Sequence, residues 1–278
     1  MRNHLIRLTL RLLRKTRLLT VFNFFLTSID GKFRIPIIKG LGFDHFFEKE
    51  EWLLIALKKW MTEYCENKYF IDVGANIGQT LLKVKSVDPG CRYIGFEPNP
   101  NCVYYLLELL NANQLKDATI YPIGLANHSG IMDLQFYSVS ATDTSASLVP
   151  GFRSSPTGSL KVPVCDLDEA GISDNTVAGI VKIDVEGGEL DVMKGLKKFL
   201  IRDRPLVICE VLPAYSMKNT SRLARQKELG AFLHSMNYLL ASIGTQGNLE
   251  SITKFEVHDD ISRVNYLFYP AEKSLIHY

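Results

Sequence analysis

FIDVGANIG, residues Phe70–Gly78, is an apolar stretch that runs into a turn with a glycine at each end. A second apolar stretch, IGFEPNP (Ile94–Pro100), follows it and carries an acid, Glu97. Glycine has no side chain to keep a ligand away from the backbone. An acid after the second strand of such a unit can accept hydrogen bonds from ribose hydroxyls. Together the two stretches predict a nucleotide-cofactor site in an α/β fold.

The order of residues in this turn indicates which cofactor it binds. Dinucleotide-binding folds use G-x-G-x-x-G to place a pyrophosphate at a helix N-terminus. The turn here reads Gly74-Ala75-Asn76-Ile77-Gly78 and follows an acid, Asp72. A carboxylate beside the turn attracts a cation and repels a pyrophosphate. The sequence therefore predicts S-adenosylmethionine, whose ammonium group can pair with Asp72, in preference to NAD.

Strand and helix patterns alternate through most of the chain. Predicted strands lie at Tyr69–Val73, Arg92–Phe96, Thr119–Pro122, Ala178–Val185 and Leu206–Val211, and predicted helices at Glu48–Cys65, Gly78–Ser86, Pro100–Asn111, Glu189–Leu200 and Thr220–Met236. This alternation is typical of parallel βαβ units with right-handed crossovers. No helical pattern separates Tyr238–Ile243 from Val264–Tyr269, so we expect these strands to pair antiparallel. The predicted fold class is α/β and Rossmann-like, with a mostly parallel sheet, an antiparallel C-terminal edge strand and helices on both faces.

Acidic residues stand at the ends of two predicted strands. Asp184 and Glu186 belong to VKIDVEGGEL (Val181–Leu190), and Glu210 is near the end of the next strand. Ligands of open α/β sheets bind beyond the carboxyl ends of the strands, and residues two apart point to the same side of an extended chain. We therefore predict Asp184, Glu186 and Glu210 as the catalytic residues. Lys182 is expected to keep Asp184 ionised by its opposite charge.

These motifs, in this order, resemble the FkbM family of S-adenosylmethionine-dependent methyltransferases. The resemblance covers roughly residues 30–270, and KIDVEGGEL is its most specific part. It implies a class I methyltransferase fold and O-methylation of a hydroxyl on a small molecule, sugar or glycan. It also implies the cofactor-binding residues, which are Asp72, Gly74, Asn76 and Gly78 at the aminoacyl end, Glu97 at the ribose, and Asn99.

In the expected reaction, a hydroxyl oxygen attacks the methyl group in line with the sulfur, and positioning supplies much of the acceleration. An alcohol is a poor nucleophile, so Asp184 is the predicted base, supported by Glu186 or Glu210. The same three carboxylates are also suited to Mg²⁺. Nothing in their spacing requires an ion, and we predict no metal.

A long polar segment, Ser138–Ser159, interrupts the alternation between predicted strands at Ile131–Tyr137 and Lys161–Val164. Loops of this length in compact domains are often lids or binding segments. A solvated insertion is the alternative that its composition allows. Phe152 and Arg153 near its centre favour a hydroxylated or anionic acceptor.

Composition bounds the remaining possibilities. The chain has 278 residues and a net charge of +2, which gives no general case for nucleic-acid binding. Its five cysteines are scattered and include no C-x-x-C pair, so we expect free thiols and a cytoplasmic protein. No apolar run reaches the length of a membrane span.

Residues 1–30 differ from the rest of the chain. They carry six basic residues and one acid, a net charge of +5, and Leu5–Leu26 has a helical pattern. This basic amphipathic segment is expected either to contact an anionic membrane through residues 1–26 or to dock on protein. Residues 31–278 are predicted to form a single methyltransferase domain. An NAD-dependent oxidoreductase and a non-catalytic binding protein are the alternative functions, and the oligomeric state is open.

Overall fold

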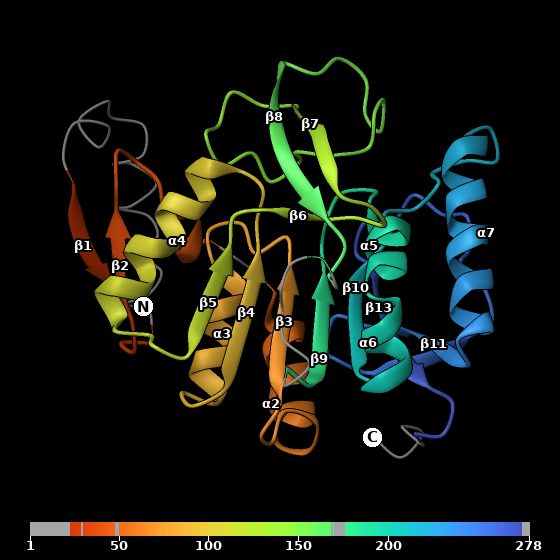
Figure 1. The fold of residues 1–278 in the computed structure, drawn as a ribbon, viewed down its shortest axis with the longest axis horizontal. Coiled ribbons are helices and arrows are strands. Elements are labelled where there is room, and N and C mark those ends of the chain that lie inside the picture. Colours follow the sequence, from red (N-terminus) through yellow and green to blue (C-terminus); the bar gives the residue numbers. More distant parts are fainter. Residues whose placement is uncertain (1–22, 29, 48–49, 168, 170–175, 274–278) are drawn as a thin grey trace.

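The alternation predicted from Tyr69 onward forms a continuous sheet in the structure. The computed structural model describes residues 23–28, 30–47, 50–167, 169 and 176–273. Within these ranges the main sheet has the order β12-β11-β13-β10-β9-β3-β4-β5 (Figure 1). Its parallel strands are β3 (Tyr69–Val73), β4 (Arg92–Phe96), β5 (Ala118–Tyr121), β9 (Ala178–Ile183) and β10 (Leu206–Glu210).

The C-terminal strands reverse direction, as the sequence predicted. Strand β13 (Asn265–Pro270) runs antiparallel to β10 on one side and to β11 (Tyr238–Ile243) on the other. Strand β12 (Leu249–Ile252), which was not predicted, extends the sheet by pairing antiparallel with β11. The expected α/β class with an antiparallel C-terminal edge is therefore confirmed.

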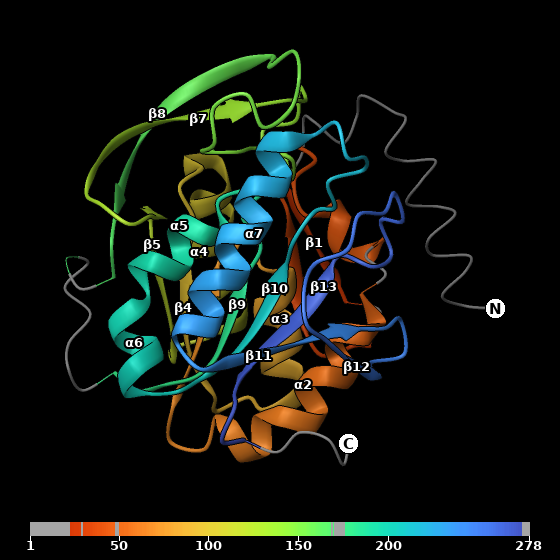
Figure 2. The same cartoon turned by 90° about the vertical axis from the view of Figure 1, so that its right-hand side faces the viewer.

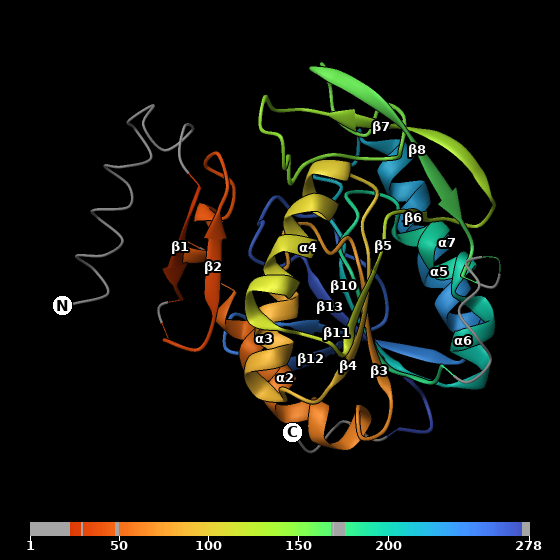
Figure 3. The same cartoon turned by 60° about the vertical axis from the view of Figure 1, so that its left-hand side comes forward.

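Helices cover both faces of this sheet, as Figures 2 and 3 show. One face is covered by α2 (Glu51–Tyr64), α3 (Gln79–Val87) and α4 (Pro100–Asn113), and the other by α5 (Glu189–Gly195), α6 (Lys197–Arg202) and α7 (Thr220–Ser235). All residues of β9 are buried, as expected for a central strand covered on both sides. The predicted helix Glu189–Leu200 is divided at Leu196, and the Ala126 carbonyl packs closely against Gly195 just before the break.

A smaller sheet lies above the carboxyl ends of the parallel strands (Figure 1). It is formed by β6 (Gly124–Leu125), β8 (Gly158–Cys165) and β7 (Gly130–Phe136), with β7 and β8 antiparallel. The long polar segment predicted as a lid joins β7 to β8. The second sheet thus holds that loop over the edge where ligands of α/β sheets bind.

Residues before the main sheet form a hairpin against α4. Strand β1 (Phe24–Thr27) pairs antiparallel with β2 (Arg34–Ile37), and Tyr105 of α4 donates a hydrogen bond to the Pro36 carbonyl. The helical prediction for the end of Leu5–Leu26 is therefore wrong, since Phe24 and Leu26 pack inward while Phe25 is exposed. The predicted division at residue 30 falls inside this hairpin.

Residues 1–22, with most of the basic segment and its predicted membrane contact, lie outside the described residues. A short 3-10 helix, η2 (Phe43–Phe46), connects the hairpin to α2. All five cysteines are free, as predicted. Among the helices in the described ranges, none combines the length and apolar character needed to cross a membrane.

Candidate active site

A cavity of about 450 Å³ opens at the carboxyl ends of β3, β4, β9 and β10. The segment before α2 and the loop between β7 and β8 complete its walls. Both sequence motifs contribute to it, with Gly74 and Asn76 from the first and Asp184 and Glu186 from the second. The two motifs therefore belong to one site.

Gly74 allows the ends of β3 and β9 to come together. Its φ is +87°, and a Cβ at this position would lie 1.9 Å from the carbonyl oxygen of Asp184. The Asp184 N–H in turn donates to the Val73 carbonyl at 3.0 Å. Asn76 also has a positive φ, of 46°, and Gly78 precedes the first residue of α3. The turn is thus shaped by close backbone approach.

Glu97 connects the turn to the end of β4. Its carboxylate accepts the backbone N–H of Asn76 and that of Asn99, each at 2.8 Å. Burial raises the pKa of Glu97 to about 7, and the two N–H donors oppose that shift. The carboxylate lines the cavity and keeps lone pairs that can accept further hydrogen bonds.

Asn99 begins α4 and joins it to the loop above. Its side-chain oxygen accepts the N–H of Asn101, which caps the helix, and its amide donates to the Ala141 carbonyl at 3.0 Å. Asn99 also lines the cavity. It therefore holds the loop against the cofactor end of the site.

Asp72 is positioned differently from the expectation. Its side chain is fully buried, accepts a hydrogen bond from the Tyr93 hydroxyl at 2.5 Å, and is not among the residues that line the cavity. Burial raises its pKa to about 6, and Lys182 opposes that shift. The predicted direct contact between Asp72 and a cationic ligand is replaced by an indirect role, in which Asp72 supports Lys182 from below the cavity.

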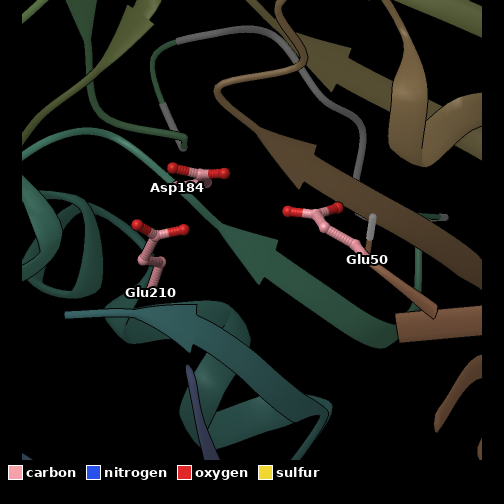
Figure 4. Close-up of side chains that lie close together, drawn as sticks. All are labelled: Glu50, Asp184 and Glu210. Atoms are coloured by element: carbon pink, nitrogen blue, oxygen red, sulfur yellow. The ribbon is translucent and has the colours of Figure 1, made fainter. Parts of the chain in front are cut away.

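Three carboxylates converge at the other end of the cavity, and Figure 4 shows them pointing toward one another. They are Glu50, Asp184 and Glu210, and their oxygens lie within 4.8 Å of one another. We call this group the carboxylate cluster. Lys182 and Glu210 each stand two residues after Ile180 and Ile208, which pack in the core beneath α2. Both therefore lie on the α2 side of the sheet.

Lys182 is the cation within this group. Its ammonium lies 3.0 Å from the Asp184 carboxylate, as predicted. Burial alone would lower the pKa of Lys182, but the charges of Asp184, Asp72 and Glu50 together raise it above its ordinary value. Lys182 therefore stays protonated and compensates Asp184.

Glu210 has the most perturbed carboxyl group of the cluster. The charge of Asp184 and burial raise its pKa to about 9, and Lys182 opposes the shift. No ion pair to Glu210 occurs among the described residues. The neighbouring Asp184 charge therefore makes an ionised Glu210 unfavourable, and a hydrogen-bond donor from a ligand relieves that repulsion.

Glu50 was not among the residues predicted from the sequence. This residue precedes α2, and its carboxylate forms an ion pair with Lys83 of α3 at 3.2 Å. Burial raises the pKa of Glu50. No sequence motif indicates Glu50, because it is far in sequence from the strand ends. Only the position of α2 in the fold brings it to them.

Glu186 is not part of the carboxylate cluster. The strand ends at Ile183, and Glu186 has a positive φ of 50°, so the alternation of an extended chain does not apply to it. Its carboxylate pairs with Arg153 at 2.6 Å, and its carbonyl accepts the Ser147 hydroxyl at 2.7 Å. The expectation that it faces the same group as Asp184 is corrected, and Glu50 takes that place.

The loop between β7 and β8 forms one wall of the cavity through Asp143, Thr144, Ala146, Leu148, Val149 and Pro150. Phe152 packs on Gly187 so closely that a Cβ there would lie 2.4 Å from its ring. Arg153, which was expected to meet an anionic acceptor, forms an ion pair with Glu186 instead.

The sequence of the site matches a known family. Residues 72–240, more than half of the chain, match the model of the methyltransferase FkbM domain. The chain belongs to this family. It is therefore a methyltransferase (EC 2.1.1.-) that depends on S-adenosylmethionine, and the oxidoreductase alternative is wrong.

Individual relatives are more distant. The methyltransferase is 28% identical over 177 residues to the hexuronic acid methyltransferase AglP of Haloferax volcanii, a match that covers 62% of this chain and 67% of AglP. A methyltransferase FkbM structure from Methylobacillus flagellatus has a TM-score of 0.46 at 18% identity, over 73% of this chain and 43% of that one. The methyltransferase thus spans less than half of that protein. An O-methyltransferase from Bacillus cereus, solved with SAH, has a TM-score of 0.45 at 10% identity over 77% and 78% of the chains.

Proposed function

We propose that the protein transfers a methyl group from S-adenosylmethionine to a hydroxyl of a carbohydrate. The observation that carries this proposal is the carboxylate cluster, which adjoins the glycine turn within one cavity. Carboxylates are suited to accept the proton of an alcohol. The similarity to AglP, a hexuronic acid methyltransferase, supports a sugar as the acceptor.

The residues present fit S-adenosylmethionine. Gly74 lines the cavity, and its lack of a side chain lets the ends of β3 and β9 come together there. Glu97 offers acceptors for ribose hydroxyls. The acidic lining suits a ligand with a sulfonium and an ammonium group. We assign cofactor binding to Gly74, Asn76, Glu97 and Asn99, with Gly78 setting the turn and Asp72 supporting it from below. When bound, S-adenosylmethionine supplies an activated methyl group and its sulfur leaves with the bonding electron pair.

The chain's own part in the reaction is to orient the hydroxyl and take its proton. Asp184 is the member of the cluster next to the glycine turn, so we assign it the role of base. Lys182 forms an ion pair with that carboxylate at 3.0 Å and offsets its negative charge. Glu210 and Glu50 lie close enough to share the proton or to hold neighbouring hydroxyls.

Methyl transfer from labelled S-adenosylmethionine to a panel of sugars, polyols and polysaccharide fragments tests this function. We expect a base-stable methyl ether on a sugar, with turnover reduced about 10²- to 10⁴-fold in Asp184→Asn, the range that general base catalysis contributes. A base-labile methyl ester, or label found only on nitrogen, would contradict O-methylation of a hydroxyl.

The same assay tests metal assistance. We expect full activity after exhaustive chelation, because Lys182 already supplies the compensating charge beside Asp184. Activity that is lost with chelator and restored by Mg²⁺ would instead assign the carboxylate cluster to an ion.

A further inference from the structure

The cavity is lined by many more acidic than basic side chains. Among the described residues that line the cavity, Lys182 is the lysine and Arg225 is the arginine. The acidic lining residues are Glu50, Glu97, Asp143, Asp184, Glu186, Asp191 and Glu210. This balance suits a cationic cofactor. It also restricts what else can enter the same space.

The basic side chains in and beside the cavity are already engaged. Lys182 pairs with Asp184, and Arg225 donates to the Asp191 carboxylate at 2.8 Å and to the Gly187 carbonyl at 3.1 Å. Arg153 pairs with Glu186 at 2.6 Å. The carboxylate of an acceptor that entered the cavity would have to compete with these ion pairs.

His128 is the remaining basic group on the cavity wall within the described part of the chain. It is exposed, and its Nδ1 lies 2.8 Å from the side-chain oxygen of Asn127. It follows β6, on the side of the cavity formed by the smaller sheet, whereas the cluster lies at the ends of β9 and β10. His128 therefore does not offset the acidic end.

The carboxylate cluster accepts hydrogen bonds rather than giving them. Asp184 and Glu50 are each paired with one lysine, and Glu210 has no ion-pair partner among the described residues. A hydroxyl or ammonium group relieves the mutual repulsion of these carboxylates, whereas a further carboxylate increases it.

We propose that the acceptor is a neutral or amino sugar and not a uronic acid, and that Glu50 and Glu210 select it; this rests on the sugar O-methylation proposed above. Glu50 and Glu210 flank Asp184 and accept hydrogen bonds from the hydroxyl or ammonium groups that neighbour the reacting oxygen. The proposed acceptor differs from that of AglP, a hexuronic acid methyltransferase.

Matched methyl glycosides test this selection. The gluco, galacto and manno series are each assayed as the parent hexose, the 2-amino sugar and the hexuronic acid, so that a single substituent changes. Two readouts are used, kcat/KM for methyl transfer and the Kd of each glycoside in the presence of S-adenosylhomocysteine. We expect the hexose or amino sugar of the accepted series to exceed its uronic acid at least ten-fold in both.

Variants assign the selection to residues. Glu50→Gln and Glu210→Gln should each reduce the preference over the uronic acid at least three-fold, and unchanged S-adenosylhomocysteine binding shows that each variant is folded. Glu51→Gln, one position along on the exposed side of α2, is the matched control and should leave the preference unchanged.

Four outcomes overturn the proposal or a part of it. A wild-type preference for the uronic acid overturns the proposal but not sugar O-methylation. Turnover of the uronic acid that requires Mg²⁺ and is lost with chelator has the same consequence. A preference that neither variant alters removes the assignment to Glu50 and Glu210. Binding and methylation of none of the glycosides overturns this proposal and the proposed function together.

Discussion

The carboxylate of Glu97 holds the backbone N–H of Asn76 at 2.8 Å, so the acid at the end of one strand fixes the turn after its neighbour. Its second oxygen holds the N–H of Asn99, where α4 begins. One buried side chain therefore shapes the glycine turn, the start of a helix and the predicted ribose site at once.

Glu97→Gln should weaken cofactor binding. An amide has one acceptor oxygen in place of two, so it cannot satisfy both backbone N–H groups and the ribose. We expect the Kd of S-adenosylmethionine to rise about 10- to 100-fold, the loss that follows from leaving one or two hydrogen bonds unmade, as measured by titration calorimetry. Glu66→Gln, an exposed acid beyond the far end of α2, is the control and should bind normally.

The same residue should make stability depend on pH. Burial raises the pKa of Glu97 from 4.5 to about 7, so the folded state keeps a proton that the unfolded state releases between these values. The unfolding free energy of the ligand-free protein should therefore fall as pH rises through this window. Glu97→Gln should remove up to about 3 kcal/mol of that fall, as measured by denaturant unfolding at pH 5 and pH 8. An unchanged slope would show that other groups cause it.

Gly74→Ala should lower the free energy of unfolding far more than Gly40→Ala, although the two glycines have the same φ. Gly74 and Gly40 both have a φ of +87°, but a Cβ at Gly40 meets nothing within 4 Å. Gly40→Ala should therefore cost only the strain of the left-handed conformation, about 1–2 kcal/mol. Gly74→Ala adds a clash with the Asp184 backbone, and we expect at least about 3 kcal/mol with loss of cofactor binding. Equal unfolding free energies for the two variants would contradict the close approach described for β3 and β9.

Lys182→Met should move the pH dependence of turnover. Lys182 opposes the rise in pKa of Glu210 and of Asp72, so without it the carboxylate cluster should hold protons to higher pH. A base works only when ionised, so the acid limb of the kcat profile should shift upward by at least one unit, with turnover near pH 7 down about 10²-fold. Lys161→Met, which breaks an exposed pair with Asp133, is the control. A uniform loss without a pH shift would indicate a structural role only.

The fold could be predicted because its signals are local. Apolar segments of strand length, glycine turns and helical spacing recur along the chain around β3, β4 and β9. Each of these signals can be recognised from residues that are close together in the sequence. The pair between Lys182 and Asp184 was predictable for the same reason, since two residues on one strand share a face.

The rest of the site depends on how the chain ends its strands and folds back. Glu186 was misplaced because the strand stops at Ile183 and a left-handed residue redirects the side chain toward Arg153. Asp72 has the position expected in sequence, but the Tyr93 hydroxyl keeps it below the cavity. Glu50 carries no local signal, because only the packing of α2 against the sheet brings it to Asp184.

The origin of Glu50 has a consequence for how this enzyme can diversify. The family match begins at residue 72, so Glu50, which we propose contacts the acceptor, comes from a segment outside it. Gly74 and Glu97, which we assign to the methyl donor, lie within it. Substitutions ahead of the matched region can alter which molecule is modified and leave donor affinity unchanged. New specificities can therefore arise by exchanging the preceding helix and its acid, with the donor-holding half inherited intact.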